Sequence, residues 1–289
     1  MSNVIIIGNG PAGISAALYT TRAGIDTTII GRDYGALGKA SEIENYFGFK
    51  EPITGKHLIS EGLEQAKRLG TKVITDEVVG LTYLDKIIVQ TKEMEYRADS
   101  VILATGSSRS TPNIKGLKEF EGHGVSYCAV CDAFFYRGKD VAVLGNGEYA
   151  LHEALELLQT SNSVTILTDG KDPTAIIPEN IKVIKDKIES ISGENKVENV
   201  IFQDKSSISI AGLFVAVGVA GSSDLAKKIG AFTENNKIFV DENMATTIPG
   251  LYAAGDGTGG LLQISKAVYE GAKAGTEVIK YLRKNQVAV

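Results

Sequence analysis

A glycine-rich turn between a strand and a helix occurs twice in this chain, and the repeat constrains the fold more than any other feature. In the first copy the apolar residues 4–7 lead into the pattern G-x-G-x-x-G at residues 8–13, and a segment of helical composition follows. The second copy begins at Val141 and aligns without a gap, with Gly145 in the place of Gly8. A strand that runs through this pattern into a helix is typical of a dinucleotide-binding βαβ unit. Two such units predict an α/β protein with two Rossmann-like, three-layer domains.

Each residue of the first turn has a task in binding a dinucleotide. Gly8 permits the tight turn, Gly10 lets the backbone approach a pyrophosphate, and Gly13 allows the helix to pack closely on the strand. Pro11 and Ala12 lie between them at the start of the helix, whose free N–H groups can bind the anion. These five residues are therefore candidate cofactor ligands.

The length and charge of the chain limit what such domains can do. At 289 residues the chain is long enough for two domains. Its net charge of −5 at pH 7 argues against broad nucleic-acid binding, which needs a basic face. The longest apolar runs, such as residues 213–217, are strand-sized, so we expect no membrane span. The first residues already have a strand pattern instead of a signal-peptide pattern, and we expect a reducing cytoplasmic compartment.

Both cysteines of the chain lie in one short segment, residues 127–132 (YCAVCD). Two sulfurs at this spacing lie within bonding range across a tight turn, so the pair can switch between disulfide and dithiol. In a reducing compartment such a pair is more often catalytic or metal-binding than structural. A zinc half-site is the alternative, but of the three histidines only His123 is close in sequence, which leaves the site short of four ligands. We therefore expect a redox pair and no metal.

Two further segments can bring cofactor contacts to the first domain. Residues 246–256 end in Ala-Gly255-Asp256, which places a carboxylate at the carboxyl edge of the sheet, where it can accept hydrogen bonds from ribityl hydroxyls. Residues 101–106 (VILATG) read as the matching crossover strand and supply the candidates Ala104, Thr105 and Gly106. Because these segments lie far apart in the sequence, the first domain is expected to be discontinuous, with the second domain inserted into it.

Five motifs occur in the order seen in the low-molecular-weight thioredoxin reductases: residues 8–13, 42–48 (EIENYFG), 104–106 (ATG), 124–132 (GVSYCAVCD) and 253–256 (AAGD). The chain resembles this family essentially from end to end. The resemblance implies that residues 1–111 and 241–289 form an FAD-binding domain. It implies that residues 112–240 form the inserted domain of NAD(P)H-binding type, which carries the cysteine pair. A homodimer is also implied.

The same resemblance implies roles for individual residues. Cys131 would face the flavin, Cys128 would attack the disulfide of thioredoxin, and Asp132 would handle the proton. These roles agree with the chemistry, because one thiolate must receive electrons while the other forms a mixed disulfide, and a carboxylate can protonate the departing thiolate. Gln263 is a candidate flavin contact, and Asn45 either contacts the flavin ring or holds its own turn.

The sequence departs from the family at the site of the electron donor. Relatives that use NADPH carry a His-Arg-Arg segment after the second glycine turn, whose guanidiniums bind the 2′-phosphate. The corresponding residues 164–172 read VTILTDGKD here, with Asp169 and Asp172 near the place of the basic cluster. Glu148 and Tyr149 also follow the second turn, where small residues would better admit a pyrophosphate.

Three electron donors are compatible with this departure. Our preferred hypothesis is that the second site is vestigial and that reduced ferredoxin supplies the electrons, as in the branch of these reductases that lacks nucleotide contacts. NADH is the second possibility, with Asp169 binding the ribose hydroxyls, and NADPH through a different set of contacts is the third. A ferredoxin partner requires a basic docking patch, and the basic residues that flank the cysteine segment are equally explained as scattered surface charges: Arg109, Lys115, Lys118, Arg137 and Lys139.

Two alternatives concern the reaction itself. The enzyme could reduce another small disulfide protein, because partner choice depends on the surface around Cys128. The chain could instead be a flavin-binding redox-sensor module whose dithiol does not turn over. Turnover with a thioredoxin disulfide separates the sensor from the enzyme.

Overall fold

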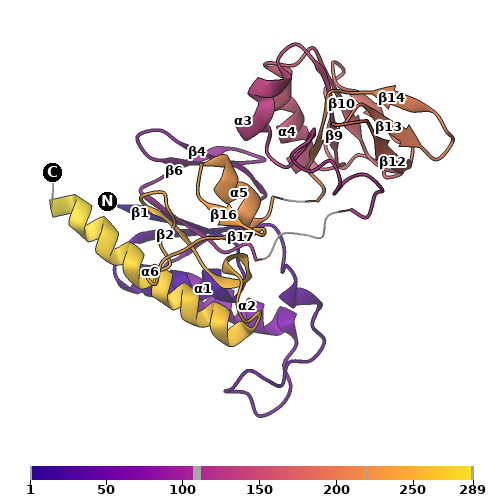
Figure 1. The fold of residues 1–289 in the computed structure, drawn as a ribbon. Helices are drawn as coiled ribbons and strands as arrows, with labels where there is room; N and C mark the ends of the chain where they lie inside the picture. The colour runs from indigo at the N-terminus through magenta and orange to yellow at the C-terminus, as the bar shows by residue number, and fades with distance from the viewer. Residues whose placement is uncertain (1, 107–111, 219, 288–289) are drawn as a thin grey trace. The chain divides into compact units, whose positions relative to one another are not determined.

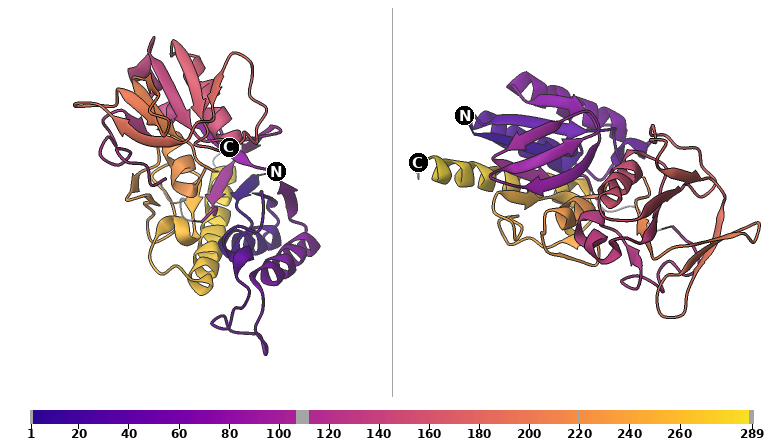
Figure 2. Two further views of the ribbon diagram at one scale, coloured as in Figure 1. Left: turned by 90° about the vertical axis from the view of Figure 1, so that its right-hand side faces the viewer. Right: turned by 90° about the horizontal axis from the view of Figure 1, so that it is seen from above.

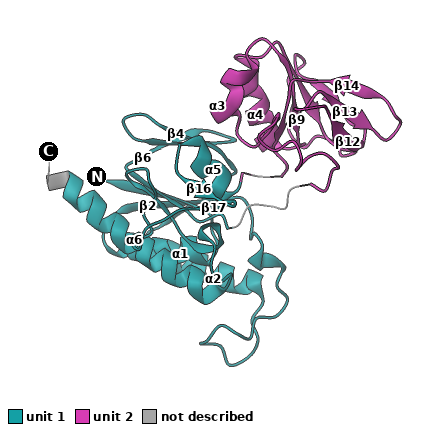
Figure 3. Ribbon diagram, in the orientation of Figure 1, with its two compact units in different colours: residues 1–108, 221–289 teal, residues 109–220 magenta. Residues whose placement is uncertain are grey.

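A computed structural model describes residues 2–106, 112–218 and 220–287, which form two compact units (Figures 1 and 3). Unit 1 comprises residues 1–108 and 221–289, and unit 2 comprises residues 109–220. The segment from 221 to 240 thus groups with unit 1, whereas the sequence analysis assigned it to the inserted domain. The reason is tertiary packing: helix α5 (Ser222–Lys228) packs against strands β4 (Val78–Tyr83) and β17 (Lys237–Ile238) of unit 1.

Unit 1 is built on a five-stranded parallel sheet with the order β18-β7-β1-β2-β3. Its strands are β1 (Asn3–Ile7), β2 (Asp26–Gly31), β3 (Lys72–Thr75), β7 (Ser100–Leu103) and β18 (Leu251–Ala253). One face is covered by the helices α1 (Pro11–Arg22), α2 (Gly55–Leu69) and α6 (Ile264–Val287), with α6 running alongside α1 (Figures 1 and 2). The other face carries an antiparallel sheet of β4, β5 (Ile87–Thr91) and β6 (Glu95–Ala98). Both faces of β1 are covered, which explains why residues 4–7 are continuously apolar and buried.

Unit 2 repeats this plan. Its parallel sheet has the order β11-β10-β9-β15-β8, made of β8 (Val125–Ser126), β9 (Asp140–Leu144), β10 (Ser163–Leu167), β11 (Lys182–Ile184) and β15 (Gly212–Val215). Helix α4 (Glu148–Leu158) follows the second glycine turn. An antiparallel sheet of β12 (Ile188–Ser192), β13 (Asn199–Phe202) and β14 (Ser207–Ser209) shares a hydrophobic core with the parallel sheet. The expected α/β fold with two Rossmann-like, three-layer domains is therefore confirmed.

Two of the remaining short elements, α3 (Ala129–Asp132) and η3 (Gly255–Thr258), carry residues of the candidate site. In unit 2 the four-residue helix α3 continues into the 3-10 turn η2 (Ala133–Tyr136). In unit 1 the 3-10 turns η1 (Leu37–Lys39) and η3 and the short strand β16 (Thr233–Glu234) complete the fold. No helix in the described part of the chain is both long enough and apolar enough to cross a membrane.

Candidate active site

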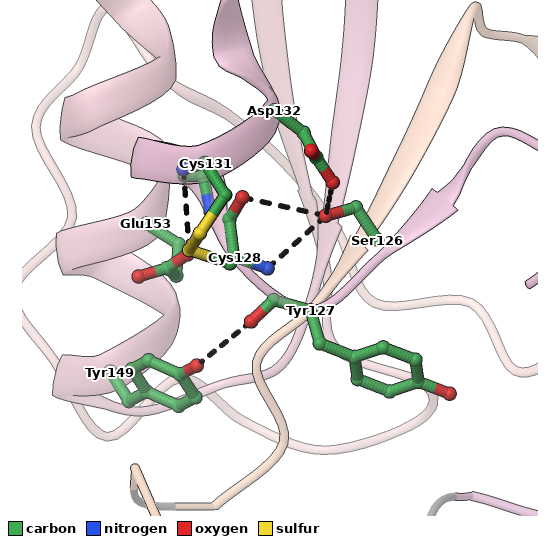
Figure 4. The surroundings of a disulfide bond; sticks show 8 residues. Ser126, Tyr127, Cys128, Cys131, Asp132, Tyr149 and Glu153 are labelled. Atoms are coloured by element: carbon green, nitrogen blue, oxygen red, sulfur yellow. Dashed lines mark hydrogen bonds between the residues drawn. A yellow bond between two sulfur atoms is a disulfide. The ribbon is translucent and has the colours of Figure 1, made fainter. Parts of the chain in front are cut away.

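The two cysteines form a disulfide at the start of α3, with their Cα atoms 5.3 Å apart (Figure 4). Cys128 is the N-cap of this helix, and its Sγ accepts a hydrogen bond from the Cys131 N–H at 3.2 Å. Cys128 is only 4% exposed, whereas Cys131 is exposed. Cys128 thus lies inside the unit, and Cys131 lies at its surface. The assigned attack by Cys128 requires that its sulfur becomes accessible once the bond is reduced.

Asp132 is connected to the backbone of Cys128 through a serine that the sequence analysis did not single out. Ser126 donates its hydroxyl proton to Asp132 Oδ2 at 2.7 Å, and the same hydroxyl oxygen accepts from the Cys128 N–H at 3.1 Å. Burial, together with the negative charge of Asp132, raises the pKa of the Tyr136 phenol. The Asp132 carboxylate is therefore held by Ser126 and lies close enough to Tyr136 for its charge to raise the pKa of that phenol.

A second carboxylate approaches the pair from α4. Glu153 is 1% exposed, and its Oε2 accepts a hydrogen bond of 2.6 Å from the N–H of Ala129, the residue after Cys128 (Figure 4). One turn earlier on α4, the Tyr149 hydroxyl donates to the carbonyl oxygen of Tyr127 at 3.4 Å. The sequence contained one signal for Glu153, because it stands among the apolar residues 150, 154 and 157 of a helix. A carboxylate on a buried helix face is rare without a specific partner.

The glycine turn of unit 1 has the shape that a pyrophosphate needs. Gly8 has φ +115°, and a side chain there would collide with the backbone of Ala104 at the end of β7. Gly10 is the N-cap of α1 and Pro11 is its first residue, so the first turn of the helix has no capping side chain. A side chain added at Gly10 would meet no described atom within 4 Å. The turn therefore leaves open space directly in front of the helix N-terminus, which fits a bound anion.

Most of the other predicted cofactor residues lie around this turn. Gly255 is next to Ala12, since a side chain at Gly255 would come within 3.0 Å of the Ala12 Cβ. Gly106 approaches Gly257 of η3, the turn that also contains Asp256. The ends of β7 and β18 and the start of α1 thus meet at the carboxyl edge of the sheet, where doubly wound folds bind their ligands.

Three more observations complete the description of unit 1. Thr105 forms a hydrogen bond of 2.7 Å between its hydroxyl and that of Ser222. Asn45 donates its side-chain amide to Gln263 Oε1 at 3.0 Å, so the structure joins these two exposed candidates to each other. Glu270 holds η3, because it accepts from the Gly255 N–H at 2.8 Å and forms an ion pair of 2.9 Å with Lys266.

The glycine turn of unit 2 is covered, in contrast to the first. The Thr174 N–H donates to the carbonyl oxygen of Asn146 at 2.7 Å, and the Asn146 side chain donates to the carbonyl oxygen of Asp172 at 3.0 Å. A side chain added at Gly147 would come within 3.3 Å of the Thr174 hydroxyl oxygen. The loop that follows β10 therefore lies over the position where a pyrophosphate would approach.

The two aspartates after β10 also have protein partners. Asp169 Oδ1 accepts from the Ile188 N–H at 2.9 Å. Asp172 forms an ion pair of 2.8 Å with Lys185, which lowers the pKa of the Asp172 carboxyl through a hydrogen bond and through charge. Both carboxylates thus stabilise the loop. In the described ranges, no group of three or more His, Cys, Asp or Glu could hold a metal ion.

A redox-active disulfide on one unit and an open dinucleotide turn on the other define a cofactor-dependent disulfide oxidoreductase. Residues 2–271 match the family model for pyridine nucleotide-disulphide oxidoreductases. The thioredoxin reductase of Rickettsia prowazekii is 35% identical, over 98% of this chain and 99% of the relative. Among solved structures, the atypical thioredoxin reductase TRi from Desulfovibrio vulgaris Hildenborough is 43% identical, with a TM-score of 0.93, and covers 98% of this chain and 99% of that one.

A ferredoxin-flavin thioredoxin reductase from Clostridium acetobutylicum is 31% identical with a TM-score of 0.73, and the match covers 98% of both chains. The chain therefore belongs to the pyridine nucleotide-disulphide oxidoreductase family and, within it, to the low-molecular-weight thioredoxin reductases. As a member it is an FAD-binding flavoenzyme that reduces thioredoxin. This membership favours the enzyme over the redox-sensor module.

Proposed function

We propose that the protein reduces thioredoxin with electrons that reduced ferredoxin delivers through FAD. The observation that carries the choice of donor is the covered glycine turn of unit 2, where Thr174 lies in the place that a nucleotide pyrophosphate needs. Asp169 and Asp172 stand near the place of the arginines that bind a 2′-phosphate, and both are used within the protein. A ferredoxin-flavin thioredoxin reductase is also among the solved structures that the chain resembles, at 31% identity.

We assign FAD to unit 1, because its glycine turn is open and uncapped. The residues that would hold the cofactor lie at the carboxyl edge of the sheet: Gly8, Gly10, Pro11, Ala12, Gly13, Ala104, Thr105, Gly106, Gly255 and Asp256, with Asn45 and Gln263 as a hydrogen-bonded pair at the flavin. When bound, FAD supplies two-electron chemistry that the amino acids lack. A homodimer and a cytoplasmic location are part of the proposal on the strength of the family resemblance.

The chemistry of the cysteine pair then follows in balanced steps. Two electrons and two protons convert the Cys128–Cys131 disulfide to the dithiol. The Cys128 thiolate attacks one sulfur of the thioredoxin disulfide, which forms a mixed disulfide and releases the other thioredoxin sulfur as a thiolate. Cys131 then attacks the Cys128 sulfur, which releases reduced thioredoxin and restores the internal disulfide. Asp132, held by Ser126, is the group assigned to transfer protons.

A direct test of the donor mixes the oxidised holoenzyme anaerobically with reduced ferredoxin, NADPH or NADH and follows flavin absorbance. We expect prompt bleaching with ferredoxin. Bleaching with either nucleotide should be at least about 100-fold slower, because the hydrogen bonds that an open turn donates to a pyrophosphate, roughly 1.5–3 kcal/mol each, cannot form at the covered second turn. Prompt bleaching by NADPH or NADH would identify that nucleotide as the donor and refute the ferredoxin proposal.

The surface beside the disulfide gives a test of thioredoxin binding. Phe134 and Phe135, three and four residues after the exposed Cys131, are 71% and 65% exposed, and Val130 is 52% exposed. Aromatic side chains in such a position form the energetic centre of many interfaces, so Phe134→Ala with Phe135→Ala should raise the KM for thioredoxin about tenfold or more at unchanged FAD content. The matched control is Phe232→Ala, an aromatic residue of unit 1 that is 54% exposed. Steady-state kinetics with varied thioredoxin measures the effect, and an unchanged KM would show that thioredoxin docks elsewhere.

The basic residues proposed as a ferredoxin patch are all exposed where the structure describes them. Lys115, Lys118, Arg137 and Lys139 lie on the surface of unit 2, and Arg109 falls outside the described residues. Arg137 lies over the ring of Phe134 and Lys139 over that of Tyr136, each at 5.8 Å from the ring centre. Arg137 and Lys139 support a ferredoxin-docking role because these ring contacts hold them in the segment that follows the cysteine pair.

A further inference from the structure

The reaction scheme above uses Asp132 and leaves Glu153 without a role, although Glu153 is the more deeply buried of the two carboxylates. Its Oε2 is 2.6 Å from the backbone nitrogen of Ala129, and its side chain is 1% exposed. In Figure 4 it points from α4 toward the end of α3 that carries the disulfide. A buried charged group is costly unless it has specific partners, so its position beside the redox pair calls for a function.

The sulfur of Cys128 and the carboxylate of Glu153 occupy the same end of α3. The Cys131 N–H donates to Cys128 Sγ at 3.2 Å, and the Ala129 N–H donates to Glu153. On the other side, Ser126 links Asp132 to the Cys128 N–H. Two carboxylates, Asp132 and Glu153, thus lie beside the pair; the Tyr149 hydroxyl donates to the Tyr127 carbonyl oxygen, and the charge of Asp132 acts on the Tyr136 phenol.

The electrostatic consequence differs between the two redox states. The disulfide is neutral, whereas the reduced pair carries a negative charge whenever one thiol ionises. A second negative charge close by, on a carboxylate that is itself buried, disfavours that thiolate. The carboxylate therefore raises the free energy of the reduced pair relative to the disulfide, and a destabilised reduced form makes a stronger reductant.

We propose that Glu153 tunes the cysteine pair by charge, keeping the Cys128/Cys131 dithiol a strong enough reductant to reduce thioredoxin. Glu153 is thus a positioning and tuning residue that acts through Cys128 and the Ala129 N–H, and it transfers no proton or electron itself. The inference rests on the proposed thioredoxin reductase function but is independent of the electron donor, because the property concerned is the equilibrium of the pair.

The experiment measures the dithiol–disulfide equilibrium of the FAD-loaded protein in anaerobic dithiothreitol redox buffers of stepped composition. Samples are quenched with an alkylating reagent and weighed by intact-mass spectrometry. The chain contains only two cysteines, so the mass reports the state of this pair alone. Flavin absorbance confirms that each variant is folded and loaded. Neither ferredoxin nor thioredoxin is present, so failure of the donor proposal and failure of this one are distinguishable.

Glu153→Gln keeps the shape of the side chain and an oxygen that can accept from Ala129 but removes the charge. We expect its equilibrium to shift toward the reduced pair by about tenfold near pH 8.5, which is about 30 mV for a two-electron couple. The shift should become smaller as the pH is lowered, because protonation of the thiols removes the negative charge that Glu153 repels. A purely structural disturbance would not have this dependence on pH.

Three further variants complete the test. Glu153→Ala also removes the charge and should shift the equilibrium in the same direction, so the test does not depend on a single neutral variant. Glu153→Asp keeps the charge and should stay closer to the wild type than either. Glu179→Gln changes the net charge equally on an exposed loop of unit 2 and should have no effect. If either folded neutral variant keeps the wild-type equilibrium near pH 8.5, or shifts toward the disulfide, the proposal is wrong.

Discussion

Replacing Cys128 with serine is expected to abolish thioredoxin reduction while the flavin remains reducible by its donor. The hydroxyl of serine is not ionised near neutral pH and does not attack a disulfide, so turnover should fall by at least about 1,000-fold. The substitution changes one atom at a position that is 4% exposed, so the fold should survive. Steady-state assays with thioredoxin measure the loss, and anaerobic flavin absorbance checks that the first half of the reaction is intact.

Cys131→Ser is the matched variant that separates the two sulfurs. It keeps the attacking thiol but lacks the thiol that resolves the mixed disulfide, so it should accumulate a covalent complex with thioredoxin that mass spectrometry detects. Cys128→Ser should form no such complex. This pair of variants tests the assignment strictly, because in the disulfide form Cys131 is the exposed residue and Cys128 the buried one. If only Cys128→Ser traps thioredoxin, the roles of the two cysteines are reversed.

The fold class could be predicted from the sequence because the motifs that indicate it are local. The apolar runs before Gly8 and Gly145 and the helical segments after them lie within a few residues of the turn they define. The residue at which the chain returns to unit 1 was harder to predict from the sequence. Residues 221–240 contain no motif, and their assignment depends on the packing of α5 against β4, which is more than a hundred residues away in the sequence.

The same distinction between local and distant contacts applies to the site. The cysteine pair, Asp132 and the first glycine turn belong to contiguous motifs, and the structure places the members of each motif together. Glu153 and Thr174 lie 24 and 28 residues from the residues they contact. The Glu153 carboxylate accepts from the Ala129 N–H, and Thr174 donates to the Asn146 carbonyl oxygen through both its N–H and its hydroxyl. Such contacts depend on the course of a loop or the rotation of a helix, and no spacing rule predicts them. The missing arginines suggested a vestigial second site, and the cover over Gly147 adds a geometric reason that the sequence did not contain.

Placing valine at Gly10 and, separately, at Gly147 compares the two turns under the same substitution. Both glycines have extended backbones, with φ −80° and −115°, which valine adopts readily. At Gly10 the side chain enters open space in front of α1, so Gly10→Val should fold, with a cost of about 1 kcal/mol at the N-cap. The valine would nevertheless occupy the approach of the pyrophosphate, and FAD affinity should fall at least about 100-fold because charge-assisted hydrogen bonds to the anion, worth roughly 1.5–3 kcal/mol each, are lost.

Flavin absorbance per protein after purification, followed by FAD titration of the apoprotein, measures this loss, and circular dichroism confirms the fold. Gly147→Val is the matched control: it meets the Thr174 hydroxyl at 3.3 Å but should leave FAD content, flavin reduction and thioredoxin turnover close to wild type. Full FAD occupancy in Gly10→Val would contradict the assignment of the cofactor to unit 1. Slow flavin reduction in Gly147→Val with normal FAD content would show that the second turn binds the electron donor, and a nucleotide would then replace ferredoxin in that role.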